Sequence, residues 1–591
     1  MKGMKRVLTL EAEGKMGENI SVAGWVNSRR DHGGLIFVDL RDEKGILQLV
    51  VTPDTEEAFH LAEAVRDEYV LSASGKVRER ADELKNPNIP TGDIELVVEK
   101  LEVLNRADTP PVNTHDEGER TGEELRLKYR YLDLRRPKMQ ELIRKRSEYY
   151  QILRKYMTER DFVEVTTPIL ANSSPEGARD FLVPSRLKPG LFYALPQAPQ
   201  QFKQLLMVGG VPRYFQIAPC FRDEDPRADR LYGDFYQLDM EMSFIEDGEE
   251  IRELMEPLIV SLVKDFAGKK LVSEKIPRLS YTEAMEKYGT DKPDLRYGLE
   301  LIELTDVFQN TEFKVFKQPC VKAILVPNGS DFTRSQIDNF TEQARKLGAG
   351  GLAYIIYQAD GTEKSPIAKF LSPAELQAIR EKTGAKPGDT VFFGADERAK
   401  VNKVLGVLRE TFAEVKELKS DNEVALCWVT DFPFYEWNDG ERKIDFGHNP
   451  FSMPKGGLAA LKAAKSDDEK LAILADQYDM VMNGYEICSG AVRNHNPDIM
   501  YEAFSNIGYD HEFVEKKFGG MLNAFRFGAP PHAGCAFGID RIFMVLTDQK
   551  NIRDIIAFPK NGSGYDLMMG SPSEVEAGQL EELNLAITEE D

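Results

Sequence analysis

Cysteine is scarce in this sequence, and its five copies among 591 residues stand far apart. No two of them form a CxxC pair, so the spacing argues against a zinc ribbon and against a small scaffold held by disulfides. Long apolar runs are also missing: the longest have about five residues, as at 542–546, whereas a membrane-spanning helix needs about 20. No apolar segment of signal-peptide length follows the basic N-terminus. These absences predict a cytoplasmic protein without a membrane segment.

Positive charge is in the minority. The chain has 76 lysines and arginines against 99 aspartates and glutamates, which gives a formal net charge of −23. The last twenty residues, 572–591, hold seven of the acids and no basic residue. An acidic total does not predict a nucleic-acid-binding protein, so any such contact has to come from local basic patches. The length suggests about four domains, at about 150 residues for each domain.

The N-terminal region has the pattern of a small β-barrel. Short apolar or alternating segments are separated by glycine turns, and one helical segment lies between the third and the fourth. The expected strands are 20–26, 35–40, 46–51, 70–77 and 94–98, and the expected helix is 56–67. This order is typical of the OB-fold, although the pattern alone also fits other small β-barrels.

The remainder of the chain has the pattern of a linker, an interrupted domain and an acidic tail. Residues 140–160 have the apolar spacing of a helix, and a separate α+β block further on begins and ends in mid-domain, so we interpret it as an insertion. The expected segments are the barrel at 1–106, the linker at 107–138, the interrupted domain at 139–281 and 416–570, the insertion at 282–415 and the tail at 571–591.

Three motifs stand out along the interrupted domain. They are the helix ending at Thr167-Pro168, the charged segment Phe221-Arg222-Asp223-Glu224, and Gly538-Ile539-Asp540-Arg541. Each is weak alone, because a charged loop or an ordinary helix start has the same appearance. In this order, downstream of an OB-like barrel, they resemble motifs 1, 2 and 3 of the class II aminoacyl-tRNA synthetases.

The resemblance extends over essentially the whole chain to the bacterial type of aspartyl-tRNA synthetase. The segments that carry it include 24–27, 35–42, 174–180, 194–200, 202–205, 448–451 and 483–486, together with Arg493. The insertion resembles the GAD domain of that type. The resemblance implies an α+β multidomain protein with an OB-fold anticodon-binding barrel, a catalytic domain on an antiparallel sheet, and a GAD-like insertion. It also implies a homodimer that uses ATP and Mg²⁺ to join L-aspartate to tRNA.

The first reaction of such an enzyme is the attack of a carboxylate on the α-phosphate of ATP, which needs positioning and charge neutralisation. The resemblance implies that Arg222 bridges the two reacting groups and that Arg541 holds the γ-phosphate; the planar fork of arginine suits such oxygen pairs. Asp479 and Glu486 would supply oxygen ligands to Mg²⁺. The implied ATP-binding residues are Arg222, Asp223, Glu224, Glu486, Gly538, Ile539, Asp540 and Arg541.

Aspartate and asparagine differ mainly in charge, so a site that rejects asparagine needs cations directed at the β-carboxylate. Lys203 and Arg493 match the side-chain clamp of the family. The resemblance also gives acidic partners for the substrate ammonium, a histidine contact and polar orienting groups. The implied aspartate-binding residues are Glu176, Gln200, Lys203, Arg222, Asp239, His448 and Arg493.

In the barrel, Arg30, Phe37 and Gln48 match the anticodon-binding residues of the family, because an aromatic ring can stack a base and an amide can read a base edge. The alternative is that Phe37 belongs to the barrel core. His32 matches relatives that accept both tRNA(Asp) and tRNA(Asn), whereas Lys85 is more typical of strict tRNA(Asp) enzymes. The unbroken match around His32 favours an enzyme that charges both tRNA(Asp) and tRNA(Asn). The alternative is an enzyme that charges tRNA(Asp) alone.

Other functions share parts of this pattern. An asparaginyl- or lysyl-tRNA synthetase has the same barrel and catalytic layout, but the Lys203 and Arg493 pair and the insertion argue against both. An ammonia-dependent asparagine synthetase resembles the catalytic fold but lacks the barrel. A non-enzymatic single-strand-binding protein would not need Arg222, Arg541 and the two acidic residues together.

Overall fold

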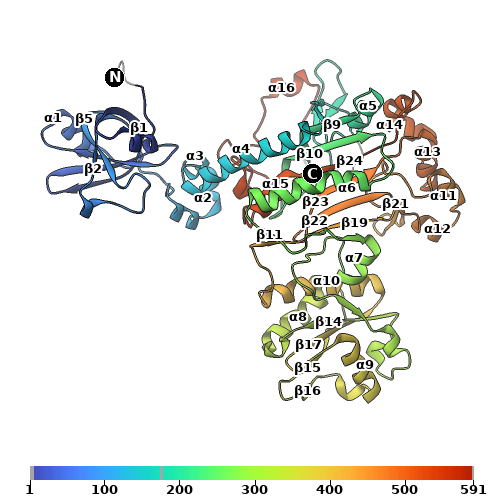
Figure 1. Cartoon of the computed structure of the whole chain (residues 1–591). Helices are drawn as coiled ribbons and strands as arrows, with labels where there is room; N and C mark the ends of the chain where they lie inside the picture. Colours follow the sequence, from blue (N-terminus) through green and yellow to red (C-terminus); the bar gives the residue numbers. More distant parts are fainter. Residues whose placement is uncertain (1–4, 174–177, 589–591) are drawn as a thin grey trace. The chain divides into compact units, whose positions relative to one another are not determined.

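The computed structural model describes residues 5–173 and 178–588 of the chain (Figure 1). Contacts divide the chain into two compact units: residues 1–144 with 566–571, and residues 145–565 with 572–591. Each unit is described by itself. In the part of the chain that is described, no helix has both the length and the apolar character needed to cross a membrane.

The first unit contains a closed five-stranded barrel in the order β1-β2-β3-β5-β4. Its strands are β1 (Asn19–His32), β2 (Leu35–Arg41), β3 (Ile46–Val51), β4 (Val70–Glu79) and β5 (Ile94–Asn105). Helix α1 (Glu56–Ala64) lies between β3 and β4 in the chain, as the sequence pattern predicts. Alternation along β2 buries Ile36, Val38 and Leu40 and directs Phe37 outward. The expected OB-fold is therefore confirmed.

Three helices follow the barrel: α2 (Glu123–Lys128), α3 (Arg130–Asp133) and α4 (Pro137–Thr158). The linker before α4 is fastened to the barrel by Glu68, which is 3% exposed and has a left-handed φ of 65°. Its carboxylate pairs with Arg41 at 2.8 Å and with Arg135 at 2.7 Å, and it accepts a hydrogen bond from Thr114 at 2.7 Å. Helix α4 begins at Pro137, a residue type favoured in the first helical turn.

The second unit is built on an eight-stranded sheet in the order β12-β19-β22-β23-β24-β10-β9-β6. The central pairs are antiparallel, whereas the outer pairs β12–β19 and β6–β9 are parallel. The strands are β6 (Val163–Glu164), β9 (Arg213–Arg222), β10 (Gly233–Ser243), β12 (Arg278–Ser280), β19 (Leu426–Thr430), β22 (Gln477–Met482), β23 (Tyr485–Val492) and β24 (His532–Gly538). The antiparallel catalytic sheet expected from the resemblance is thus present.

Helices and three two-stranded pairs accompany this sheet. The helices are α5 (Gln200–Val208), α6 (Glu249–Ser261), α11 (Gly457–Ala463), α12 (Asp467–Leu471), α13 (Pro497–Asn506), α14 (His511–Phe525), α15 (Ile539–Leu546) and, near the end of the described chain, α16 (Ala577–Glu582). Two-stranded pairs are formed by β7 (Leu182–Pro184) with β8 (Phe192–Ala194), β11 (Lys270–Leu271) with β18 (Glu423–Val424), and β20 (Tyr435–Asn438) with β21 (Lys443–Phe446).

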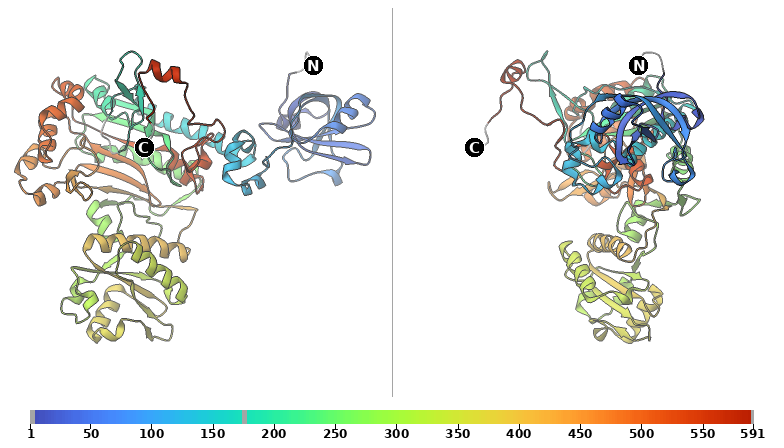
Figure 2. Two further views of the ribbon diagram at one scale, coloured as in Figure 1. Left: turned by 180° about the vertical axis from the view of Figure 1, so that it is seen from behind. Right: turned by 90° about the vertical axis from the view of Figure 1, so that its left-hand side faces the viewer.

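The insertion is an α+β block with its own sheet, coloured from green to yellow-brown in Figure 2. Its strands, in the order β13-β14-β17-β15-β16, are β13 (Leu301–Glu303), β14 (Cys320–Val326), β15 (Ala353–Tyr357), β16 (Glu363–Lys364) and β17 (Thr390–Asp396). Its helices are α8 (Arg334–Lys346), α9 (Pro373–Thr383) and α10 (Arg398–Val415), and α7 (Tyr281–Tyr288) precedes it. Both faces are covered: Phe392 packs in one apolar cluster and Phe393 in the other.

Candidate active site

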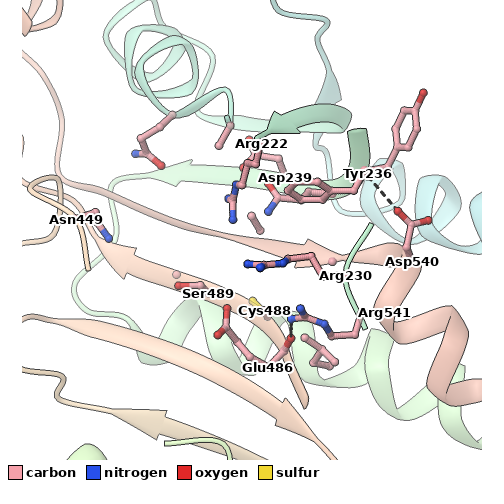
Figure 3. A pocket seen from close by; sticks show the side chains of 18 of the residues that line it. Arg222, Arg230, Tyr236, Asp239, Asn449, Glu486, Cys488, Ser489, Asp540 and Arg541 are labelled. Carbon is pink, nitrogen blue, oxygen red and sulfur yellow. Dashed lines mark hydrogen bonds between the residues drawn. The ribbon is translucent and has the colours of Figure 1, made fainter. Parts of the chain in front are cut away.

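A cavity of about 320 Å³ opens on the large sheet between β9, β10, β23, β24 and the start of α15. Figure 3 shows the guanidinium groups of Arg222, Arg230 and Arg541 directed into the same space, with Glu486 beside Arg541. Its lining includes Gln200, Lys203, Arg222, Glu224, Arg230, Asp239, His448, Glu486, Arg493, Gly538, Asp540 and Arg541. Residues of motifs 2 and 3 therefore meet at one cavity, whereas no described residue of motif 1 lines it.

One end of the cavity is formed by two buried cations. Lys203, from α5, and Arg493, which directly follows β23, are 2% and 5% exposed. Lys203 Nζ lies 2.6 Å from Asp239 Oδ1 and 3.3 Å from Glu241 Oε2. Arg493 Nε lies 3.0 Å from Glu241 Oε1. Two positive and two negative groups are therefore buried together at this end of the cavity.

The charges in this cluster are fixed by their neighbours. Burial alone lowers the pKa of Lys203, but the attraction of Asp239 and Glu241 outweighs it and raises the pKa above the ordinary value. Burial raises the pKa of Glu241, but Arg493 and Lys203 reverse this and hold that pKa low. For Asp239 burial prevails, and the pKa stays raised despite Lys203. The cluster therefore keeps both cations charged at neutral pH.

Asp239 has room for a further donor. Its Oδ2 is buried without a geometrically acceptable hydrogen-bond partner among the described residues. A buried acceptor in this state costs free energy until a donor reaches it. Asp239 lines the cavity, so its carboxylate suits an ammonium group of a bound amino acid.

Glu241 is a residue of this cluster that the sequence reasoning missed. It follows Asp239 by two positions on β10, and residues two apart on a strand share a face. That spacing was the available signal. Gly534 on β24 lies opposite Glu241, and a Cβ at that glycine would come within 2.1 Å of Glu241 Oε2. The glycine therefore leaves the space that the carboxylate occupies.

Gln200 is oriented by a chain of polar side chains. Its Nε2 donates to Gln204 Oε1 at 3.0 Å, and Gln204 Nε2 lies 3.0 Å from His532 Nε2. His532 Nδ1 lies 2.8 Å from the carbonyl oxygen of Pro530, so Nδ1 carries the proton and Nε2 accepts from the amide. Burial lowers the pKa of His532, which is consistent with this neutral form.

The other end of the cavity carries the arginines of motifs 2 and 3. The Arg222 guanidinium lies over the Phe235 ring at 5.0 Å, and its buried Nε has no hydrogen-bond partner in the part of the chain that is described. Arg541 donates to the backbone oxygen of Glu486 and lies 3.2 Å from Asp229. Such cationic groups suit a polyphosphate.

Two other motif residues, Glu224 and Asp540, line the cavity but are already paired with protein groups. Glu224 lines the cavity but pairs with Arg230 at 2.8 Å. Asp540 binds Arg146 and accepts the backbone N–H of Tyr236 at 3.1 Å, so its carboxylate stabilises the scaffold (Figure 3).

Two of the predicted ATP-binding side chains do not line the cavity. Ile539 is fully buried in the core. Asp223 accepts a hydrogen bond from Tyr232 at 3.2 Å and lies 3.7 Å from Arg179. Their predicted ATP contacts stay predictions.

Asp479 and Glu486 form the predicted metal pair. Burial and the neighbouring Glu486 raise the pKa of Asp479 well above its usual range. Burial also acts to raise the pKa of Glu486, but Lys292, at 2.8 Å, prevails and lowers it. Among the described residues no group of three or more His, Cys, Asp or Glu forms a metal cage. Two carboxylates nevertheless fit Mg²⁺, which usually takes one or two from the protein and its other oxygens from phosphates and water.

His448 lines the cavity beside this pair, and its ring packs edge-on against Phe432 at 4.9 Å between centroids. Burial lowers the pKa of His448, so the ring is neutral at neutral pH. Glu176, predicted to contact the substrate ammonium, lies outside the described residues.

The predicted anticodon residues share one face of the barrel. Register pairs Arg30 with Phe37 and Asp39 with Gln48, and directly paired residues lie on the same face. Phe37 is partly exposed and lies outside the core cluster, so the interpretation of Phe37 as core is wrong. Arg30 pairs with Asp39 at 2.9 Å.

The other three barrel positions differ in exposure. Gln48 is 8% exposed and donates to Glu95 at 3.0 Å. His32 is exposed and pairs with Leu35 on the same ladder, so it shares the face of Phe37. Lys85 is held by Glu79 at 2.9 Å and by Asp82 at 2.8 Å, and these hydrogen bonds raise its pKa.

Comparison with known proteins agrees with this geometry. Residues 122–562 match the family described as tRNA synthetases class II (D, K and N), and residues 20–104 match the OB-fold nucleic acid binding domain. The chain belongs to the class II tRNA synthetases. It is thus an aminoacyl-tRNA ligase, and the hypotheses of an ammonia-dependent asparagine synthetase and of a non-enzymatic single-strand-binding protein are not supported.

Two relatives of this class II synthetase are similar over nearly their full length. The aspartate–tRNA(Asp/Asn) ligase of Chlorobium phaeobacteroides (strain BS1) is 51% identical over 575 residues, 96% of this chain and 93% of the relative. The protein of the same name from Sinorhizobium medicae (strain WSM419) is 50% identical over 576 residues, 96% of each chain.

Solved synthetase structures share the fold. Asparaginyl-tRNA synthetase from Pyrococcus horikoshii, complexed with asparaginyl-adenylate, has a TM-score of 0.58 at 20% identity and covers 94% of this chain and 98% of its own. A putative aspartyl-tRNA synthetase from Leishmania major Friedlin has a TM-score of 0.59 at 19% identity, covering 95% and 94%.

Proposed function

We propose that this synthetase activates L-aspartate with ATP and transfers it to both tRNA(Asp) and tRNA(Asn). The observation that carries the amino-acid assignment is the buried pair Lys203 and Arg493, both held charged inside the cavity. Relatives about 50% identical are named aspartate–tRNA(Asp/Asn) ligases, which supports both halves of the proposal.

In the first step, an oxygen of the aspartate α-carboxylate attacks the α-phosphorus of ATP. A carboxylate–phosphorus bond forms, the bond to the β-phosphate oxygen breaks, and pyrophosphate leaves. Arg222, supported by the Phe235 ring, neutralises the charge that develops at the α-phosphate, and Arg541 holds the far phosphate. When bound, Mg²⁺ would neutralise charge between the phosphates, with Asp479 and Glu486 as its protein ligands.

In the second step, the terminal ribose hydroxyl of the tRNA attacks the activated carbonyl carbon. A new ester bond forms and AMP leaves. The protein's contribution is to hold the adenylate, because no side chain needs to become a covalent nucleophile.

The charge cluster gives a physical basis for choosing aspartate over asparagine. Lys203 and Arg493 are donors with no acceptor atoms, so they bind a carboxylate and leave an amide N–H without a partner. Asp239 Oδ2 takes the substrate ammonium, which places the β-carboxylate toward the two cations. The same site favours aspartate over a lysine substrate, because the positive side chain of that substrate would be repelled by Lys203 and Arg493.

The barrel is proposed to select the tRNA. His32, Arg30 and Phe37 lie on one face, where a ring can stack an unpaired base and an imidazole can donate or accept a hydrogen bond. The imidazole tolerates either pyrimidine at the anticodon position that separates tRNA(Asp) from tRNA(Asn). The ion pairs of Lys85 with Glu79 and Asp82 make that lysine less available for the strict role.

Assembly and location complete the proposal: the enzyme acts in the cytoplasm as a homodimer. Motif 1 includes the edge strand β6 and ends at Pro168; Val163 on β6 is 53% exposed, and Ile169 and Leu170, just after the motif, are 47% and 52% exposed. Apolar side chains gathered at a sheet edge favour burial against a second copy. Light scattering at micromolar concentration should give about twice 66.8 kDa.

The decisive experiment is ATP–pyrophosphate exchange with each of the twenty amino acids, followed by charging of purified tRNA(Asp) and tRNA(Asn). Exchange that depends on aspartate, and charging of both tRNAs, are the expected results. Exchange that depends on asparagine or lysine would overturn the amino-acid assignment. Charging of tRNA(Asp) alone would establish the strict alternative.

A further inference from the structure

The loop at the base of the insertion reaches Glu486, the member of the predicted metal pair that lines the cavity. It spans residues 289–296, after α7, and carries Lys292, whose Nζ lies 2.8 Å from Glu486 Oε2. The lysine side chain is 41% exposed and does not line the cavity itself. It therefore approaches Glu486 from outside the space that ATP would occupy.

This loop is fastened by the insertion. Arg409 on α10, which is 2% exposed, donates to the backbone oxygen of Asp294 at 2.7 Å and to that of Gly298 at 2.9 Å. Gly289 packs against α10 so closely that a Cβ there would come within 2.8 Å of Gly406 Cα. The position of Lys292 is thus set by helix α10 rather than by the loop alone.

We propose that Lys292 is an internal counter-cation for Glu486, which holds the carboxylate until a nucleotide delivers a divalent cation. In the free enzyme, the ammonium group neutralises one of the two carboxylates that a cation would use. A divalent ion arriving alone meets a fixed positive charge next to its ligand, and close like charges repel strongly where water is partly excluded. An ion that arrives bound to a triphosphate comes with the negative charge of the phosphates. The complex is then attracted to the Lys292 ammonium instead of being repelled by it.

The residue type and its surroundings suit a group that moves. Lysine carries a compact charge on a flexible stem, whereas arginine holds a carboxylate in a rigid fork. The exposed part of the stem leaves room for movement, and the carboxylate of Asp291 lies 3.9 Å from Nζ. When the ammonium leaves Glu486, Asp291 is a partner within reach.

The consequence is that cation binding depends on ATP. Asp479 and Glu486 without Lys292 would attract divalent ions from solution, and a cation bound in advance could fix the carboxylates before the phosphates are in place. Lys292 prevents this, and the inserted domain takes part in the reaction by holding the loop. This inference rests on the proposed nucleotide site, but binding of a metal ion alone is a separate measurement from aspartate-dependent exchange.

The test is titration of the full-length protein with Mn²⁺ alone, with free Mn²⁺ followed by electron paramagnetic resonance and no nucleotide or amino acid present. We expect Lys292→Met to bind Mn²⁺ about tenfold more tightly than the unmodified protein. Lys292→Arg, which keeps the charge, should bind as the unmodified protein does. Addition of a non-hydrolysable ATP analogue should reduce the difference in Mn²⁺ affinity between Lys292→Met and the unmodified protein.

A matched control is Lys264→Met. Lys264 is 39% exposed and pairs with Glu274 at 2.7 Å in the same unit, so its loss removes a similar ion pair elsewhere. Its Mn²⁺ affinity should stay within about twofold of the unmodified protein, because an exposed pair has little influence at a distance. If Lys292→Met does not fold, Lys292→Gln removes the same charge and carries the same expectation.

The double variant Lys292→Met with Glu486→Gln locates the effect. The gain in Mn²⁺ affinity should disappear in it, because the released carboxylate is gone. Equal Mn²⁺ affinity of Lys292→Met and the unmodified protein, or a gain that survives Glu486→Gln, would overturn the proposal. Failure of aspartate-dependent exchange with the expected Mn²⁺ result would instead contradict the proposed amino-acid substrate.

Discussion

Arg493 Nε donates a hydrogen bond to Glu241 Oε1 over 3.0 Å, in a part of the cavity where the two side chains are 6% and 0% exposed. The two residues are 252 positions apart in the chain. Arg493 Nη2 also donates to Glu241 Oε2 at 3.4 Å and to the backbone oxygen of Gly534 at 3.3 Å, so these contacts fix the plane of the guanidinium. The pair therefore acts as the support of the proposed aspartate clamp.

Loss of this arginine should abolish aspartate activation. Arg493→Leu leaves Glu241 buried with one cation fewer, and breaking a buried ion pair from one side costs about 3–5 kcal/mol. We expect kcat/KM for aspartate-dependent pyrophosphate exchange to fall by about two to four powers of ten. Arg526→Leu is the control, since Arg526 is 53% exposed and pairs with Glu515 at the surface. Near-normal exchange in a folded Arg493→Leu protein would contradict the assignment.

Phe37 should act on tRNA and not on adenylate formation. Its ring points away from the barrel core, so Phe37→Ala is expected to weaken aminoacylation by about 1–3 kcal/mol through lost stacking on a base. Pyrophosphate exchange, assayed without tRNA, should not change. Leu61→Ala, at a 36% exposed position on α1, is the matched control. An equal fall in both reactions would mean that Phe37 supports the fold instead.

His32 should govern the choice between the two tRNAs. His32→Leu removes the imidazole donor and acceptor, so the ratio of kcat/KM for tRNA(Asp) to that for tRNA(Asn) should rise while aspartate activation stays constant. His60→Leu, at an exposed position on α1, should leave the ratio unchanged. The proposal that the enzyme charges both tRNAs would be wrong if kcat/KM for tRNA(Asn) were less than about a thousandth of that for tRNA(Asp). That ratio corresponds to about 4 kcal/mol of discrimination.

The junction of barrel and linker should weaken in acid through Glu68. Burial raises the pKa of Glu68, but Arg41, with Thr114 and Arg135, outweighs burial and lowers it below the ordinary value. A carboxyl whose folded pKa is depressed contributes stability above its unfolded pKa of about 4.3, and that stability is lost as the pH falls through the folded pKa.

Hydrogen exchange of residues 19–51, corrected for intrinsic rates, measures this effect. Protection of these amides should fall as the pH is lowered below about 5. The free energy of opening should decrease by about 1.4 kcal/mol for each unit by which folding lowers the pKa of Glu68. Glu68→Gln should lose protection already at pH 7 and show a flatter dependence on pH. Parallel curves for the two proteins would show that Glu68 is not the group responsible.

Local patterns predicted much of this molecule because they depend on neighbours within a few residues. Alternation gave the barrel strands and the helix between the third and fourth, and helical spacing gave the core of α4. Motifs 2 and 3 identified Arg222 and Arg541, and the matching segment 483–486 identified Glu486; all three residues line one cavity. The expected outer boundaries of the six segments and the homodimer stay predictions.

The tertiary structure decided which groups touch. The pairing of Glu241 with Arg493 depends on β24 lying between β10 and β23. The pairing of Lys292 with Glu486 depends on where α10 holds a loop. The direction of Phe37 depends on how the strand sits in the closed barrel. Strand order and packing between distant segments determine such contacts, because local periodicity fixes which face a side chain takes but not what lies across from it.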